Sequence, residues 1–159
     1  MVEEKVHTYL HQQNIAFSTF THAPAFTCAD MANIKKDMPH HGLIKNLFLK
    51  DKKKRYYLLV ALADTPIELK KLAQDWNAPE LRFARPDELE AILGVTPGSV
   101  TLFALLNDTE RKVTLILDSR MQTQTTIGLH PLRNDMTTLI SPQDAALFAQ
   151  SLGYEAWSI

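Results

Sequence analysis

Leu43-Ile44-Lys45-Asn46-Leu47-Phe48-Leu49 is an apolar run interrupted only by a lysine and an asparagine. It predicts a buried β-strand, whose successive side chains point to opposite faces, so Lys45 and Asn46 would lie on opposite sides of one sheet. Burying an ammonium group is costly unless the group is paired or opens onto a polar site. The run therefore indicates either a sheet-edge lysine with a packed stem and a solvated head, or a lysine that serves a functional site.

The composition is that of one globular domain. Of the 159 residues, 45% are apolar and 22% are charged, so we expect a single domain over residues 1–159 with a core of ordinary size. The formal net charge of −1 excludes a surface that is basic all round. Any contact with nucleic acid must then use a local patch of cations.

The N-terminus and the cysteine content indicate the compartment. Cys28 is the only cysteine, which excludes an internal disulfide and suits a reducing environment. Glu3 and Glu4 stand where a signal peptide would carry only bases, and no apolar run approaches about 18 residues. We expect a cytoplasmic protein that makes no membrane contact.

Periodicity and capping residues predict helices and strands that do not alternate strictly. Helices are expected over residues 2–13, 27–34, 65–76, 86–93 and 142–152. Strands are expected over residues 15–20, 43–49, 56–63, 81–84, 100–103, 113–117, 125–130 and 136–140. Thr96–Ser99 fits a type II turn. Because short turns join several strands, the sequence predicts a mixed α/β fold with helices around one curved, mixed sheet.

No set of side chains has the spacing of a metal site. His7 and His11 are four residues apart on a predicted helix, but no third ligand is near them in sequence. Cys28 follows a predicted helix cap, where the helix dipole would lower the pKa of its thiol, yet no orienting partner is identifiable. We expect a small buried thiol at Cys28, no metal and no other cofactor.

Two further segments admit two interpretations each. The turn Lys50–Arg55 holds five cations and one acid, which is typical of a solvated hairpin tip but also suits phosphate binding. In Gly128–Pro131, a histidine lies between a glycine and a proline at a strand end, where backbone N–H groups and the imidazole could meet a ligand. A structural histidine beside a turn explains the second pattern equally well.

Seven stretches occur in an order and spacing that are specific together, although none is specific alone. They are Thr21–Cys28, Lys45–Leu49, Leu93–Val100, Asn107-Asp108, Leu117-Asp118, Gly128–Pro131 and Ser141–Asp144. Over nearly the whole chain they resemble the YbaK/prolyl-tRNA synthetase-associated domain family, in particular its free-standing alanyl-tRNA(Pro) deacylases. Asn46 after Lys45 favours that branch, since the cysteine-removing branch usually has threonine there.

The resemblance implies an aminoacyl-tRNA deacylase that removes alanine from mischarged tRNA(Pro) in trans, with the ribose hydroxyl of the substrate assisting the attacking water. It implies that Lys45 holds the phosphate of the terminal nucleotide, that the backbone at Gly128 meets the substrate carbonyl, and that His130 limits side-chain size. It also implies substrate-binding and tRNA-binding residues. The substrate-binding residues would be Asn46, Thr27, Met31 and Gly98, and the tRNA-binding residues Lys50, Lys52, Lys53, Lys54 and Arg82.

The partners that the resemblance implies are the acceptor end of tRNA(Pro) and prolyl-tRNA synthetase. Selection against a smaller amino acid is limited to a few kcal/mol in one pocket, which is why a second, editing site is needed. Two alternatives stay open. One is a deacylase for another mischarged tRNA, such as Cys-tRNA, and the other is a non-catalytic tRNA-binding module.

Overall fold

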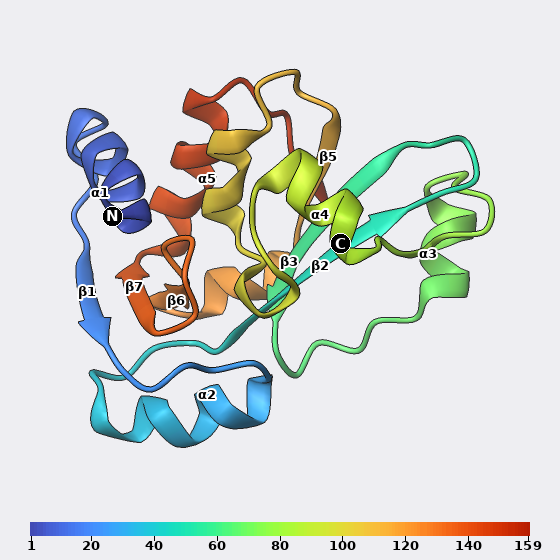
Figure 1. Cartoon of the computed structure of the whole chain (residues 1–159). Coiled ribbons are helices and arrows are strands. Elements are labelled where there is room, and N and C mark those ends of the chain that lie inside the picture. The colour runs from blue at the N-terminus through green and yellow to red at the C-terminus, as the bar shows by residue number, and fades with distance from the viewer.

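The strands form two sheets in the computed structural model, which describes residues 1–159 (Figure 1). The larger sheet has the strand order β4-β2-β3-β5-β8, which are Arg82–Phe83, Ile44–Lys50, Tyr56–Leu62, Val113–Leu117 and Trp157–Ser158. The smaller sheet has the order β1-β7-β6, which are Ser18–Thr21, Met136–Ile140 and Ile127–Leu129. An isolated bridge between Gly42 and Ile127 joins them. The mixed α/β class is confirmed, but the strands divide between two sheets where we expected one.

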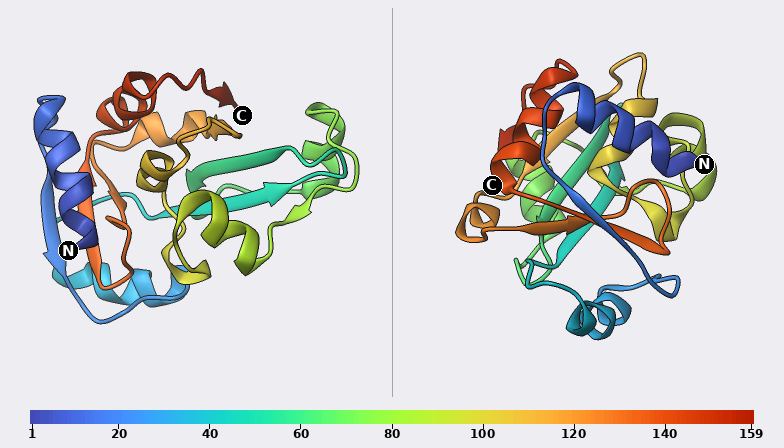
Figure 2. Two further views of the ribbon diagram at one scale, coloured as in Figure 1. Left: turned by 45° about the horizontal axis from the view of Figure 1, so that its top comes forward. Right: turned by 90° about the vertical axis from the view of Figure 1, so that its left-hand side faces the viewer.

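Helices surround these sheets. The α-helices are α1 (Val2–Gln12), α2 (Cys28–Ile34), α3 (Leu69–Asp75), α4 (Pro86–Leu93) and α5 (Pro142–Ser151). Short 3-10 helices are η1 (Lys35–Asp37), η2 (Pro97–Ser99), η3 (Leu102–Asn107) and η4 (Ser119–Thr123). The β2–β3 hairpin reaches toward α3 at one end of the molecule, while α1, β1 and α2 lie at the other end (Figures 1 and 2). None of the helices combines the length and the apolar character needed to cross a bilayer.

The β2–β3 hairpin is the centre of the larger sheet. β3 pairs antiparallel with β2 and parallel with β5, and every residue from Tyr57 to Leu62 is buried, as is typical of a strand covered on both faces. Along β2, Phe48 joins the main core while Leu49 joins a second, smaller cluster. Because faces alternate, Asn46 shares the face of Phe48 and Lys45 that of Leu49. The predicted opposite orientation of the two polar residues is confirmed.

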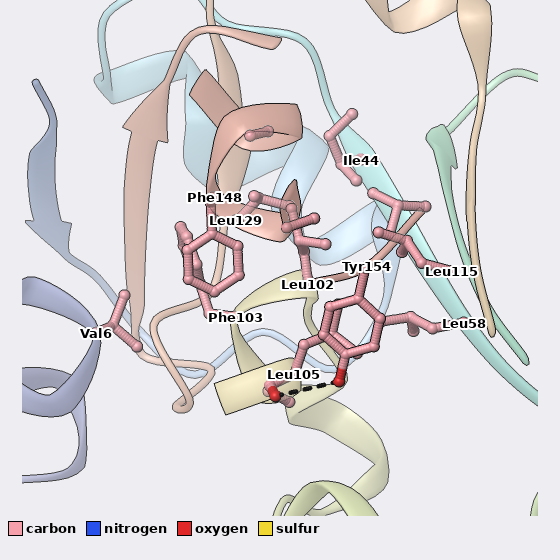
Figure 3. Close-up of a cluster of buried hydrophobic side chains, with 14 of the residues drawn as sticks. Val6, Ile44, Leu58, Leu102, Phe103, Leu105, Leu115, Leu129, Phe148 and Tyr154 are labelled. Carbon is pink, nitrogen blue, oxygen red and sulfur yellow. Dashed lines mark hydrogen bonds between the residues drawn. The ribbon is translucent and has the colours of Figure 1, made fainter. Parts of the chain in front are cut away.

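The main core joins both sheets and several helices (Figure 3). Phe103 of η3 and Phe148 of α5 meet edge to face, with ring centroids 5.2 Å apart. Tyr154 buries its ring there and donates its hydroxyl to Asp108 Oδ2 at 2.8 Å. Asp108 also accepts from the backbone of Val113 at 3.0 Å, so this buried carboxylate fixes the start of β5.

Two predicted elements differ in the structure because tertiary contacts take their residues. Thr65 does not cap a helix, since its Oγ1 donates to buried Asp118 at 2.5 Å, and α3 begins only at Leu69. Residues 100–103 are not a strand. Thr101 caps η3 instead, and Leu102–Leu105 are all buried. A short apolar run does not distinguish a strand from a buried helical turn, which explains this error.

The remaining differences are smaller. The predicted type II turn is the 3-10 helix η2, in which Gly98 does not adopt a positive φ. The first strand is Ser18–Thr21 rather than residues 15–20, and β8 was not predicted. Gly94 ends α4 in the left-handed region with φ 66°, as its position after the helix predicted.

Candidate active site

A small cavity brings together six of the predicted site residues. Its volume is about 180 Å³, and it lies between β2, the segment Ala25–Met31, the segment Pro97–Val100 and His130. The predicted residues on its wall are Thr27, Met31, Lys45, Asn46, Gly98 and His130. Lys45 is the only charged side chain among all the residues that line it. The cavity is therefore a nearly neutral hollow with one cation.

The ammonium group of Lys45 has spare hydrogen-bonding capacity. Its Nζ donates to the backbone carbonyl of Thr65 at 2.5 Å, and Lys45 takes part in none of the ion pairs of the protein. An ammonium group has three N–H donors, so two remain available. A half-buried lysine without a carboxylate partner is suited to bind an anion such as a phosphate.

Asn46 presents an acceptor without a partner. Its Oδ1 is buried and forms no hydrogen bond within the protein. Leaving a buried acceptor unsatisfied costs roughly 1–3 kcal/mol, so such groups usually serve a ligand or a water. Asn46 is among the residues that line the cavity, so this unpaired acceptor lies within the cavity wall.

His130 is held in one orientation and one tautomer. Its Nδ1–H donates to the carbonyl of Met136 at 2.8 Å. Burial lowers its pKa, and the neighbouring ring of His22, with its centroid 6.1 Å away, acts in the same direction. The imidazole is therefore neutral at pH 7, and its Nε2 has no hydrogen-bond partner in the protein.

Gly128 does not line the cavity but lies in a tightly packed position on β6. A Cβ added to it would come 2.7 Å from His41 Cδ2 and 2.9 Å from Thr137 Cγ2. His41 is only 1% exposed and its Nδ1–H donates to Pro39 O at 2.8 Å. Close packing therefore favours glycine here, because an alanine would have to displace the side chains of both His41 and Thr137.

The sequence did not single out two residues that shape the site. His41 packs behind Gly128, and nothing in its sequence context distinguishes it from exposed His40. Phe26 is 71% exposed on the cavity wall, and a Cβ on Gly98 would come 2.8 Å from its ring. An unusually exposed aromatic can be recognised only once exposure is known.

The predicted tRNA-binding cations fall into two groups. Lys52, Lys53 and Lys54 are exposed at the tip of the β2–β3 hairpin. Lys50 and Arg82 instead form ion pairs with the buried carboxylate of Glu88. The tip is distant from the cavity, because the five residue steps along β2 from Lys45 to Lys50 span roughly 17 Å.

The Glu88 carboxylate is stabilised in its charged form. Burial would raise its pKa, but hydrogen bonds from Arg82, from the backbone of Arg85 and from Lys50 outweigh burial and lower the pKa to about 2. Arg85 also pairs with Glu88, at 3.8 Å, and the ion pairs of Lys50 and Arg82 with Glu88 support the junction between β2, β4 and α4. The role of Lys50 and Arg82 in tRNA binding stays a prediction.

The environment of Cys28 differs from the one that the sequence predicted. Cys28 is exposed, so the expectation of a buried thiol was wrong. It lies at the start of α2 and is one of the residues that line the cavity. No group of three or more His, Cys, Asp or Glu side chains is arranged to hold a metal ion. A larger hollow of about 750 Å³ is lined by residues that include Thr65, Trp76, Arg120 and Trp157 and by none of the predicted site residues, although Thr65 O accepts the hydrogen bond of Lys45.

Comparison with known proteins identifies the family. Residues 22–148 match the aminoacyl-tRNA editing domain family, and this range includes every residue of the cavity wall. The chain belongs to this family. The family membership predicted from the sequence is confirmed.

Individual relatives agree with this assignment. The chain is 36% identical over 156 residues to prolyl-tRNA synthetase associated domain-containing protein 1 of Danio rerio, covering 94% of this chain and 82% of that protein. It is 32% identical over 145 residues to prolyl-tRNA editing protein ProX of Acetoanaerobium sticklandii, covering 91% and 88%. A crystal structure of a candidate trans-editing enzyme for prolyl tRNA synthetase has a TM-score of 0.76 at 16% identity, covering 99% and 95%. At that identity, the likeness concerns the fold.

Proposed function

We propose that this editing domain deacylates mischarged tRNA(Pro) in trans, with Ala-tRNA(Pro) as its main substrate. The observation that carries the proposal is the cavity of about 180 Å³ whose only charged side chain is Lys45. A volume of this size suits a small aminoacyl group rather than a nucleotide. The names of the relatives, which refer to prolyl-tRNA editing and to prolyl-tRNA synthetase, support the choice of tRNA.

In this proposal the three polar residues of the wall have separate tasks. Lys45 binds the phosphate of the terminal nucleotide through its two free N–H donors. The buried Oδ1 of Asn46 accepts a hydrogen bond from the α-ammonium group of the amino acid. His130, fixed by its bond to Met136 and neutral at pH 7, forms the wall that a larger side chain would strike.

The reaction is the hydrolysis of an ester. Water adds to the carbonyl carbon, the bond to the ribose oxygen breaks, and the proton from water passes to that oxygen, which releases the free amino acid and tRNA. Among the side chains on the cavity wall, only His130 has a free basic nitrogen that an orienting bond holds in place, and the proposal assigns this imidazole to the wall that limits side-chain size. The neighbouring ribose hydroxyl of the substrate is therefore our candidate for assisting the water.

The experiment that tests the proposal is a panel of aminoacyl-tRNAs incubated with the protein. We expect alanine to be released from tRNA(Pro) faster than cysteine or proline from the same tRNA. Faster release of cysteine would assign the protein to a different deacylase branch. Binding of the panel without release of any amino acid would leave a tRNA-binding module.

We propose, in addition, that the protein works in the cytoplasm and cooperates with prolyl-tRNA synthetase.

A further inference from the structure

The cavity borders the open edge of strand β2. β2 pairs with β3 along its whole length, whereas β4 pairs only with Leu49 and Lys50 on the other side. The four consecutive residues Ile44–Leu47 line the cavity, and no residue of β3 does. Successive strand residues point to opposite faces, so four in a row border one hollow only through the strand edge. The main chain of β2 is therefore part of the cavity wall.

The register of the hairpin determines which main-chain groups face this edge. Ala63 N–H donates to Leu43 O at 2.8 Å, and Asp51 N–H donates to Arg55 O at 3.1 Å. In an antiparallel pair, hydrogen-bonded and non-hydrogen-bonded residues alternate. The odd-numbered residues of β2 therefore direct their N–H and C=O groups to β3. Those of the even-numbered residues, including Asn46, point away from β3 toward the open edge.

No neighbouring strand takes up the groups of Asn46. On one side, pairing with the β4 segment begins at Phe48 of β2, whose carbonyl accepts from Ala84 N–H at 2.9 Å. On the other side, the bridge to β6 ends where Gly128 N–H donates to Gly42 O at 3.3 Å. The main-chain N–H and C=O of Asn46 lie between these two points without a partner in the sheet, next to the equally unpaired Oδ1 of the same residue.

We propose that the main-chain N–H of Asn46 donates to the carbonyl oxygen of the bound aminoacyl ester, so that the strand edge itself positions the reacting group. This inference rests on the proposed deacylase function. As water adds to the carbonyl carbon, the oxygen gains negative charge, and an N–H fixed in a sheet stabilises that charge without reorganising. The α-ammonium group then lies beside the main-chain carbonyl and Oδ1 of Asn46, which are its acceptors. Substrate recognition at residue 46 is thus shared between the side chain and the backbone.

Amide hydrogen exchange measured by NMR tests the first part of this inference. In the free protein, we expect the Asn46 amide to exchange at least about 10-fold faster than the Lys45 and Leu47 amides, which point to β3. An acceptor-stem analogue that carries alanine through a stable amide at its 3′ end should slow exchange at Asn46 and shift its resonance. An Asn46 amide that is already protected without the analogue, or that stays unprotected when the analogue is bound, would overturn the inference.

Replacing a single backbone amide by an ester tests the catalytic part. An asparagine α-hydroxy acid at position 46 removes the N–H and keeps the side chain, and we expect kcat/KM to fall about 100-fold, as for loss of one oxyanion donor. The matched control is the same change at Phe48, whose amide also points away from β3 but lies opposite Ala84 and outside the cavity. It should lose stability and keep its activity.

The two variants separate the inference from the proposed function. Full activity of the position-46 ester, with an active wild-type protein, would refute the backbone donor and leave the deacylase function intact. An inactive wild-type protein would instead refute the proposed function. An equal loss of activity in both variants would show a general effect of weakening the sheet and would also refute the backbone donor.

Discussion

At Lys45, charge and packing can be tested separately, because methionine keeps most of the apolar stem and removes the ammonium group. We predict that Lys45→Met lowers kcat/KM on Ala-tRNA(Pro) by at least about 100-fold, since it removes the only charged group of the cavity. Its Tm should change little, because the group forms one hydrogen bond, to Thr65, and no ion pair. The control is Lys112→Met, an exposed lysine outside the cavity, which should keep catalytic function. Near-normal turnover by Lys45→Met would remove this residue from the site.

At His130, the prediction concerns selectivity rather than rate. His130→Ala should widen the cavity, so that aminoacyl groups larger than alanine are hydrolysed faster relative to alanine. The ratio of kcat/KM for two amino acids on one tRNA measures this, because contributions from the acceptor stem cancel. Exposed His40 supplies the control His40→Ala. An equal loss for all substrates would mean that His130 positions the ester or the amine instead.

Among the elements, the junction of β2, β4 and α4 depends on the charge of Glu88. The folded pKa of about 2 lies below the value near 4.5 of a free glutamate, so the unfolded state binds more protons between these values. The stabilisation from Glu88 is therefore fully present above pH about 4.5 and is lost as the pH falls toward 2.

We predict that Glu88→Gln lowers Tm at pH 7 by roughly 3 °C or more, given about 2–4 °C per kcal/mol for a domain of this size. The difference from wild type should shrink between pH about 4.5 and 2. Asp87→Asn changes an exposed carboxylate on the same helix, with a side chain 72% exposed, and should have a much smaller effect. Thermal unfolding at several pH values measures both, and a pH-independent difference would contradict the assigned role of the charge.

On the scale of the whole molecule, the cavity and the cationic hairpin tip lie at separate places along β2. This separation suits a tRNA that places its 3′ end in the cavity and other phosphates of its backbone at the tip. We predict that Lys52→Gln, Lys53→Gln and Lys54→Asn together weaken tRNA binding and flatten its salt dependence, by up to about 0.7–0.9 in log–log slope per lost phosphate contact. Asparagine suits position 54, where φ is 65°. Lys112→Gln, elsewhere on the surface, is the control. An unchanged slope would show that the tip does not contact tRNA.

Local signals in the sequence determined the hairpin Ile44–Lys50 with Tyr56–Leu62, the helix that ends at Gly94 and the opposite orientation of Lys45 and Asn46. These features follow from strand alternation, turn chemistry and helix capping, which depend on neighbours in the chain. The family was also predicted from the sequence, because the order and spacing of several short stretches are specific together although no single stretch is specific alone.

Other features were decided only by contacts between distant residues. Thr65 donates a hydrogen bond to Asp118 instead of capping a helix, Cys28 is exposed, and the strands divide between two sheets. The tertiary structure also decided that the main-chain groups of Asn46 have no partner in the sheet, because β4 and the bridge to β6 both stop short of residue 46. A sequence lists which groups can form hydrogen bonds, whereas the tertiary structure decides which of them remain unpaired and therefore available to a substrate.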